Sequence, residues 1–162
     1  MQIFGKSFSE YVGFQKVILW LIAIVALARL ALSLGGVPNS TAKWLSVSVM
    51  ILLGAIYCSI RVHTTSFGSY KQLLVLLWIQ AMLGELIVAA SIVLGIVTGK
   101  DNIFTAPEYS GGEDGKTWLH VGAHILVGAV VLPLLNWIIG SLILFITKKV
   151  KPRDAQPAEA GA

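Results

Sequence analysis

Cysteine, charge and catalytic motifs are all scarce in this chain of 162 residues. Its single cysteine, Cys58, cannot form a disulfide within the chain, which excludes a thiol–disulfide relay through a cysteine pair. The sequence contains no phosphate-binding glycine loop, no nucleophile elbow, no dinucleotide fingerprint and no HExxH motif. These absences favour a protein that is not an enzyme, and we assign it no cofactor.

Charged residues make up only 12% of the chain while hydrophobic residues make up 56%, which lies outside the range of soluble domains. The net charge is +4, but the basic residues cluster at the ends of apolar runs. That placement is typical of membrane topology rather than of a polyanion-binding surface. We therefore expect the lipid bilayer as a partner and no nucleic acid.

Long apolar runs are what the chain has in abundance. A helix needs roughly 20 residues to cross the hydrocarbon core of a bilayer. Four runs reach about this length, and we expect spans at residues 14–34, 43–62, 73–98 and 118–147. The sequence thus predicts an all-α, four-helix transmembrane bundle as a single domain over residues 1–151, followed by a disordered cytoplasmic tail at 152–162.

Lys6 and Lys16, near the start of the first run, resemble the positive region of a signal peptide. The run's apolar stretch of about 20 residues is longer than the 7–15 of a typical signal sequence, and it contains Arg29. We interpret it as an uncleaved first span.

The distribution of Lys and Arg predicts the orientation of the bundle. One side holds Lys6, Lys16, Arg61, Lys71, Lys148, Lys149, Lys151 and Arg153, and the other holds Lys43, Lys100 and Lys116. The more basic side of a membrane protein is normally cytoplasmic. We expect both termini in the cytoplasm and a multi-pass location in the cell (inner) membrane, with Trp44 and Trp118 at the outer interface.

Two charges of opposite sign lie inside the runs. Arg29 is close to the outer end of the first run, whereas Glu85 is near the middle of the third, too deep for its short side chain to reach water. Ala81 and Ala89 share a helical stripe with Glu85, which indicates that Glu85 faces the bundle interior. We predict an intramembrane polar cluster of Arg29, Glu85 and His124. In it Glu85 pairs with Arg29, stays neutral, or takes part in a proton or cation path.

The fourth run opens with two histidines four residues apart, His120 and His124. This spacing puts both imidazoles on one helical face, where they could bind one zinc or copper ion. A third ligand would come from Glu108, Glu113 or Asp114 in the preceding loop. Two histidines on one face cannot occupy opposite sides of one haem, so a haem would need a ligand from another helix. The alternative is that one histidine bonds across helices and the other faces the headgroups.

Small residues predict where the helices approach closely. Gly95 and Gly99 form a GxxxG pair in the third run, and Gly122, Asn136 and Gly140 share a broad face of the fourth. The same surfaces could serve a homo-oligomer or other membrane subunits.

No motif in the sequence names a family or a reaction. The leading hypothesis is a non-catalytic structural or accessory component of a membrane assembly. The alternative is a small transporter or a proton- or cation-handling subunit that uses Arg29, Glu85 and His124. A further alternative is a metal- or haem-bearing membrane anchor.

Overall fold

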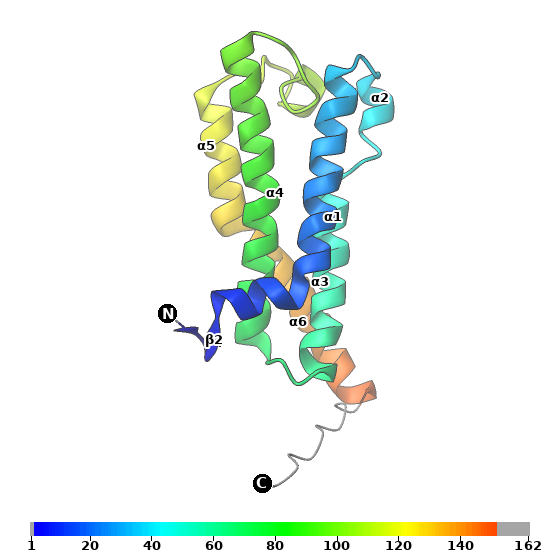
Figure 1. The fold of residues 1–162 in the computed structure, drawn as a ribbon, viewed down its shortest axis with the longest axis vertical. Coiled ribbons are helices and arrows are strands. Elements are labelled where there is room, and N and C mark those ends of the chain that lie inside the picture. Colours follow the sequence, from blue (N-terminus) through cyan, green and yellow to red (C-terminus); the bar gives the residue numbers. More distant parts are fainter. Residues whose placement is uncertain (1, 152–162) are drawn as a thin grey trace, which may run out of the picture.

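Four long helical segments stand side by side and form one bundle (Figure 1). The computed structural model describes residues 2–151. The segments are α1 (Phe8–Leu34); α2 (Asn39–Ala42) followed by α3 (Val47–Thr64); α4 (Tyr70–Thr98); and a composite of α5 (Trp118–Leu126), the π-helical turn η2 (Val127–Val131) and α6 (Leu132–Val150). Each is long and apolar enough to cross a membrane. The predicted all-α four-helix bundle is confirmed, and the chain is a multi-pass membrane protein. The predicted tail lies outside the described residues.

The two ends of the bundle differ. His63 Nε2 lies 3.1 Å from the carbonyl oxygen of Lys151, and Gln72 Nε2 donates to the carbonyl oxygen of Phe4, so both ends of the described chain lie at one end of the bundle. We call this the terminal end. The opposite end carries the connection from residue 99 to 117, and we call it the loop end (Figure 1).

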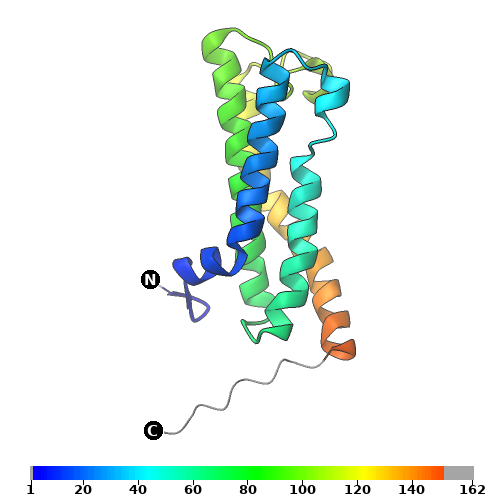
Figure 2. The same ribbon diagram turned by 45° about the vertical axis from the view of Figure 1, so that its right-hand side comes forward.

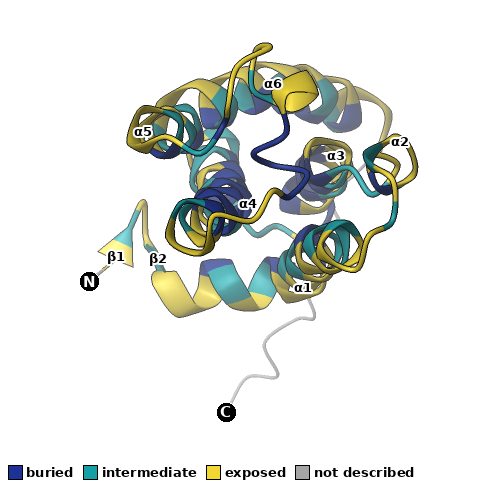
Figure 3. Cartoon of the chain, turned by 90° about the horizontal axis from the view of Figure 1, so that it is seen from above, coloured by how far each residue is buried: buried dark blue, intermediate teal, exposed yellow. Residues whose placement is uncertain are grey.

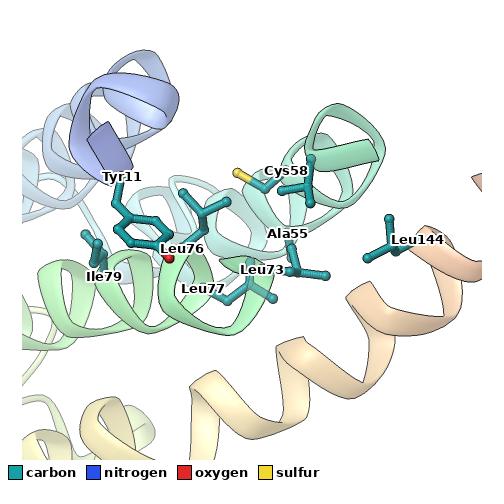
Figure 4. Packing of buried hydrophobic residues seen from close by; sticks show 9 residues of the cluster. Tyr11, Ala55, Cys58, Leu73, Leu76, Leu77, Ile79 and Leu144 are labelled. Atoms are coloured by element: carbon teal, nitrogen blue, oxygen red, sulfur yellow. The ribbon is translucent and has the colours of Figure 1, made fainter. Parts of the chain in front are cut away.

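Helix α4 is the centre of the bundle. It packs against α1, α3, α5, η2 and α6, and its apolar stretch is more buried than those of the other three segments (Figure 3). Near the terminal end its leucines meet side chains of the other helices (Figure 4). That cluster comprises Tyr11, Ala55, Cys58, Val62, Leu73, Leu76, Leu77, Ile79 and Leu144. The polar residues Gln80, Glu85 and Ser91 of α4 are therefore enclosed by neighbouring parts of the protein.

Helix α1 bends sharply at Gln15, whose φ of −118° and ψ of 16° are not helical. Residues 8–14 form an arm that crosses the bundle, and the remainder of α1 stands upright (Figure 2). Before the arm, strands β1 (Gln2–Ile3) and β2 (Lys6–Ser7) form a short hairpin, which Tyr11 fastens by donating to the carbonyl oxygen of Ile3. Fully buried Gln15 accepts from Gln80 Nε2 of α4 at 2.7 Å. The predicted span 14–34 corresponds to the upright part.

The second segment begins later than expected. In the predicted span 43–62, residues 43–46 connect α2 to α3, and α3 begins only at Val47 because Ser46 is extended and its hydroxyl accepts from the Val49 N–H, capping the helix.

The connection at the loop end folds over the bundle. It contains a 3₁₀ turn, η1 (Pro107–Tyr109), and a buried stretch before it. Ile103 is fully buried and packs with residues of α2, α4 and α5. Asn102 Nδ2 donates to the carbonyl oxygen of Ser91 at 2.9 Å, which attaches the connection to α4. The connection is therefore part of the packed structure.

Two of the predicted packing glycines lie at close contacts. A Cβ at Gly140 would stand 2.7 Å from Ser59 Oγ, so this glycine lets α6 approach α3. A Cβ at Gly95 would stand 2.9 Å from Thr105 Cγ2, so Gly95 receives the loop rather than another helix.

The other three predicted packing positions have different roles. Gly99 ends α4 in a left-handed conformation with φ of 69°, as glycine commonly does after a helix. Gly122 is exposed, and a Cβ there would meet no atom within 4 Å. Asn136 donates to the carbonyl oxygen of Leu132 in its own helix and not to a neighbouring one.

Candidate functional site

Three titratable side chains form an unbroken series of contacts between α4 and α5. Glu85 Oε2 lies 2.5 Å from His124 Nδ1, and His124 Nε2 lies 3.1 Å from His120 Nε2. His120 Nδ1 lies 2.9 Å from the carbonyl oxygen of Gly115. We call this series, from Gly115 to Glu85, the Glu–His–His chain.

The Glu–His–His chain runs from the loop end to the middle of the bundle. Glu85 is 7% exposed and lies about halfway along α4, roughly 20 Å from either end of the helix by its rise per residue. His124 and His120 are half-buried, and Gly115 is a buried part of the loop. The chain therefore links the loop surface to a carboxyl group deep in the bundle.

Local structure holds the two histidines in place. Thr117 caps α5, its hydroxyl accepting from the His120 N–H at 3.1 Å. Helical spacing then stacks His124 one turn further along the same face, with the ring centroids 4.8 Å apart. The Gly115 N–H donates to the carbonyl oxygen of Thr105, and a Cβ on Gly115 would stand 2.6 Å from that oxygen. Glycine is thus required to bring this carbonyl to His120.

A break in the fourth helix allows it to approach Glu85. A Cβ at Gly128, within the π-helical turn η2, would stand 2.6 Å from Glu85 Cβ. Just beyond the turn, Pro133 has no N–H to offer the carbonyl oxygen of Ala129. Trp78 Nε1 of α4 donates to that oxygen at 3.1 Å instead. Short π segments are common at functional sites.

Counting hydrogens shows what the Glu–His–His chain contains. A carbonyl oxygen only accepts, so His120 Nδ1 must carry a hydrogen. Each of the two remaining contacts joins two heteroatoms and needs one hydrogen between them.

Three arrangements satisfy both contacts. Either His120 or His124 is an imidazolium with Glu85 ionised, or all three groups are neutral with Glu85 protonated. All three arrangements carry no net charge. Protons can therefore shift between Glu85 and His120 without creating an uncompensated charge in the bundle.

A cavity of about 290 Å³ adjoins the Glu–His–His chain at the loop end. Its lining is Ser110, Glu113, Asp114, Gly115, Thr117, Leu119, His120 and Ala123. Two hydrogen bonds from Lys116 lower the pKa of Asp114 from its ordinary value. The bond from the backbone N–H has the larger effect, and the bond from the ammonium group has the smaller one. The Lys116 ammonium pairs with both Asp101 and Asp114. His120 thus lines a cavity that also has two acidic residues, Glu113 and Asp114, in its lining.

Arg29 does not join the predicted polar cluster. It follows buried Ile22 and Ala26 on the inner face of α1, but in the described part of the chain no ion pair links it to an acidic side chain. Its guanidinium instead lies 5.1 Å from the ring centre of Phe104 and 5.5 Å from that of Tyr109. The pair of Arg29 with Glu85, one of the three possibilities for Glu85, is not formed, because the Glu85 carboxyl group contacts His124 of α5. Arg29 thus contacts the loop through two of its aromatic rings.

The metal site predicted at His120 and His124 has no third ligand in place among the described residues. Across residues 2–151, no group of three or more His, Cys, Asp or Glu is arranged to hold a metal ion. Glu108 accepts from Asn39 Nδ2, and Asp114 is engaged by Lys116. The two Nε2 atoms do face each other, so metal binding at this pair stays a prediction.

The sequence interpretation missed two glycines and a tryptophan of this site. Gly128 lies four residues after His124, and this spacing alone places it on the same helical face. Trp78 acts through a contact with Ala129 in another helix, and Gly115 acts through contacts with Thr105 and His120 that depend on how the loop folds, so no helical spacing reveals either residue.

Comparison of the chain with protein-family models, with curated proteins and with solved structures gives no match. Inference about its function therefore starts from its own residues.

Proposed function

We propose that this protein is a proton-handling component of a membrane assembly, in which the Glu–His–His chain carries protons between the loop-end surface and the middle of the bundle. The observation that carries the proposal is the unbroken series of contacts from Gly115 through His120 and His124 to Glu85. Ionisable groups inside membrane segments commonly serve such relays.

The contacts also explain how the Glu–His–His chain would regain a proton after losing one. If Glu85 gives up its proton, one of the two shared contacts is left with two acceptors facing each other. That arrangement is unfavourable in a buried site, because neither lone pair is satisfied. The remaining shared hydrogen is then on His124 Nε2, and its movement to Nδ1 by tautomerisation restores the bond to Glu85 and transfers the empty contact to the two histidines. A proton taken up at His120 Nε2 from the acidic cavity then fills that contact. Each shift passes one proton along the chain towards Glu85.

The proposal unites two of the sequence hypotheses. The Glu–His–His chain ends at Glu85 in the middle of α4, so a further group must accept the proton there. A partner subunit would supply that group, and we therefore describe the protein as a component and not a complete transporter. The basic residues at the terminal end favour an inner cell membrane location with both termini cytoplasmic. Protons would then arrive from the outside.

Infrared difference spectroscopy on the protein in nanodiscs tests the proposal. Across the pH range in which histidine titrates, we expect a band of a protonated, buried carboxyl group to change together with imidazole bands. Glu85→Gln should remove this band, and His124→Phe should uncouple it from the imidazole bands. Glu113→Gln is the matched control, because Glu113 is an exposed carboxylate of the adjoining cavity.

Two results would overturn the proposal. One is a carboxyl band that survives Glu85→Gln. The other is a stoichiometric zinc or copper ion in the purified protein that disappears with His120→Ala plus His124→Ala, since the site would then be a metal centre.

A further inference from the structure

The bend of α1 at Gln15 creates a groove on the outside of the bundle. The groove has a volume of about 290 Å³ and lies between α1 and α4, with Val12, Lys16, Leu19, Trp20, Ala23 and Leu83 as its lining. Val12 belongs to the arm, and the other α1 residues belong to the upright part. We call it the elbow groove.

Lys16 is the one charged residue of this lining. Its side chain is exposed, and no ion pair engages it within residues 2–151. The surrounding terminal end is strongly basic. Its other described basic residues are Lys6, Arg61, Lys71, Lys148, Lys149 and Lys151, against the acidic Glu10, which pairs with Lys6.

The upright part of α1 fixes the depth of the groove. From Lys16 to Leu34 the helix rises about 27 Å, close to the thickness of a hydrocarbon core of about 30 Å. Gln15 contacts Gln80, about 15 Å along α4 from Tyr70, so Lys16 lies below the other basic residues of the terminal end. Its long side chain can extend to the headgroups, while Leu19, Trp20 and Ala23 lie deeper, in the acyl region. A cation above an apolar channel matches a phospholipid, with its phosphate above and its chain below.

We propose that the elbow groove binds one anionic phospholipid of the leaflet at the terminal end. The headgroup phosphate lies against Lys16, and an acyl chain follows Leu19, Trp20 and Ala23 towards Leu83. Charge selects the occupant, because an unpaired ammonium at the headgroup level attracts an anionic lipid over a zwitterionic one. This inference is independent of the proton-handling proposal.

Trp20 supplies the measurement, since it is 69% exposed in the structure and lines the groove. The protein is placed in phosphatidylcholine vesicles that contain a minor fraction of a lipid with brominated chains, which quench tryptophan on contact. This brominated lipid is phosphatidylglycerol in one sample and phosphatidylcholine in the other. The Trp20 contribution is the difference between the wild type and Trp20→Phe. We expect brominated phosphatidylglycerol to quench Trp20 several-fold more than the same fraction of brominated phosphatidylcholine.

Substitutions then separate the groove from the general basic surface. Lys16→Gln should abolish the preference for phosphatidylglycerol, and Lys16→Arg should keep it. Lys149→Gln, at the same end but outside the groove lining, should also keep it. Ala23→Phe, which fills the channel, should lower quenching by both lipids.

Several results would overturn the inference. Equal quenching of the wild type by the two lipids would remove the charge selection, and equal losses in Lys16→Gln and Lys149→Gln would show only a diffuse surface charge. Protection of Trp20 from both lipids would mean that a second copy of the chain occupies the groove.

Discussion

Glu85 shows how one buried carboxyl group organises its surroundings. A carboxylate deep in a bilayer is costly unless a partner compensates its charge or it takes up a proton. His124 meets both needs, because its Nδ1 either donates to the carboxylate or accepts from the protonated acid. The stripe of small residues around Glu85 correctly predicts an inward-facing side chain. It does not show which neighbouring helix lies opposite, so the choice between Arg29 and His124 required the packed structure.

Gly128 is the residue whose size controls this approach. Gly128→Ala would place a methyl group 2.6 Å from Glu85 Cβ, so α4 and the fourth helix must separate. Such overpacking destabilises a protein by about 1–3 kcal/mol. We expect a lower midpoint of thermal unfolding in detergent, together with a loss of the coupled carboxyl and imidazole bands.

Gly122→Ala is the matched control for this substitution. A Cβ at Gly122 meets no atom within 4 Å, and alanine in a helix is favoured over glycine by about 0.5–1 kcal/mol. The control should unfold at the same or a slightly higher temperature. If both variants behave alike, close packing at Gly128 is not what positions Glu85.

Among the elements, the fourth helix departs furthest from its expected form. Its apolar run predicts one continuous span at 118–147, whereas the structure divides it into α5, η2 and α6. Pro133 marks the break in the sequence, but a π-helical turn leaves no pattern of its own. The elbow of α1 is hidden for a similar reason. At the bend Gln15 contacts Gln80, a residue 65 positions further along the sequence, and no local pattern predicts such a contact.

Trp78 and Pro133 together define this break, and they provide a test of it. Trp78→Phe removes the donor to the Ala129 carbonyl oxygen, which should cost about 1–3 kcal/mol because that acceptor is left unsatisfied. In a Pro133→Ala background the new backbone N–H can serve the same oxygen. Trp78→Phe should therefore cost clearly less there than in the wild type. Equal losses of detergent stability in the two backgrounds would contradict this account.

At the scale of the whole molecule, polar groups at different heights along α4 contact different helices. Near the terminal end, Gln80 faces α1 and α3 through Gln15 and Cys58. In the middle, Glu85 faces α5. Run lengths suffice to predict four spans, because the bilayer fixes how many apolar residues a helix needs. They do not predict which side of the central helix each polar residue uses, since that depends on the order in which the spans pack.

The orientation of the bundle decides the direction in which the Glu–His–His chain would be loaded. The terminal end carries most of the Lys and Arg residues, and the more basic side is normally retained in the cytoplasm. The acidic cavity at His120 should then open to the outside, where protons are taken up. Reporter fusions at Ala162 and at Gly112 test this arrangement, using one reporter active only in the cytoplasm and another active only outside. We expect cytoplasmic activity at Ala162 and outside activity at Gly112. Exchanged compartments would reverse the direction of loading, and identical compartments would contradict the four-span topology itself.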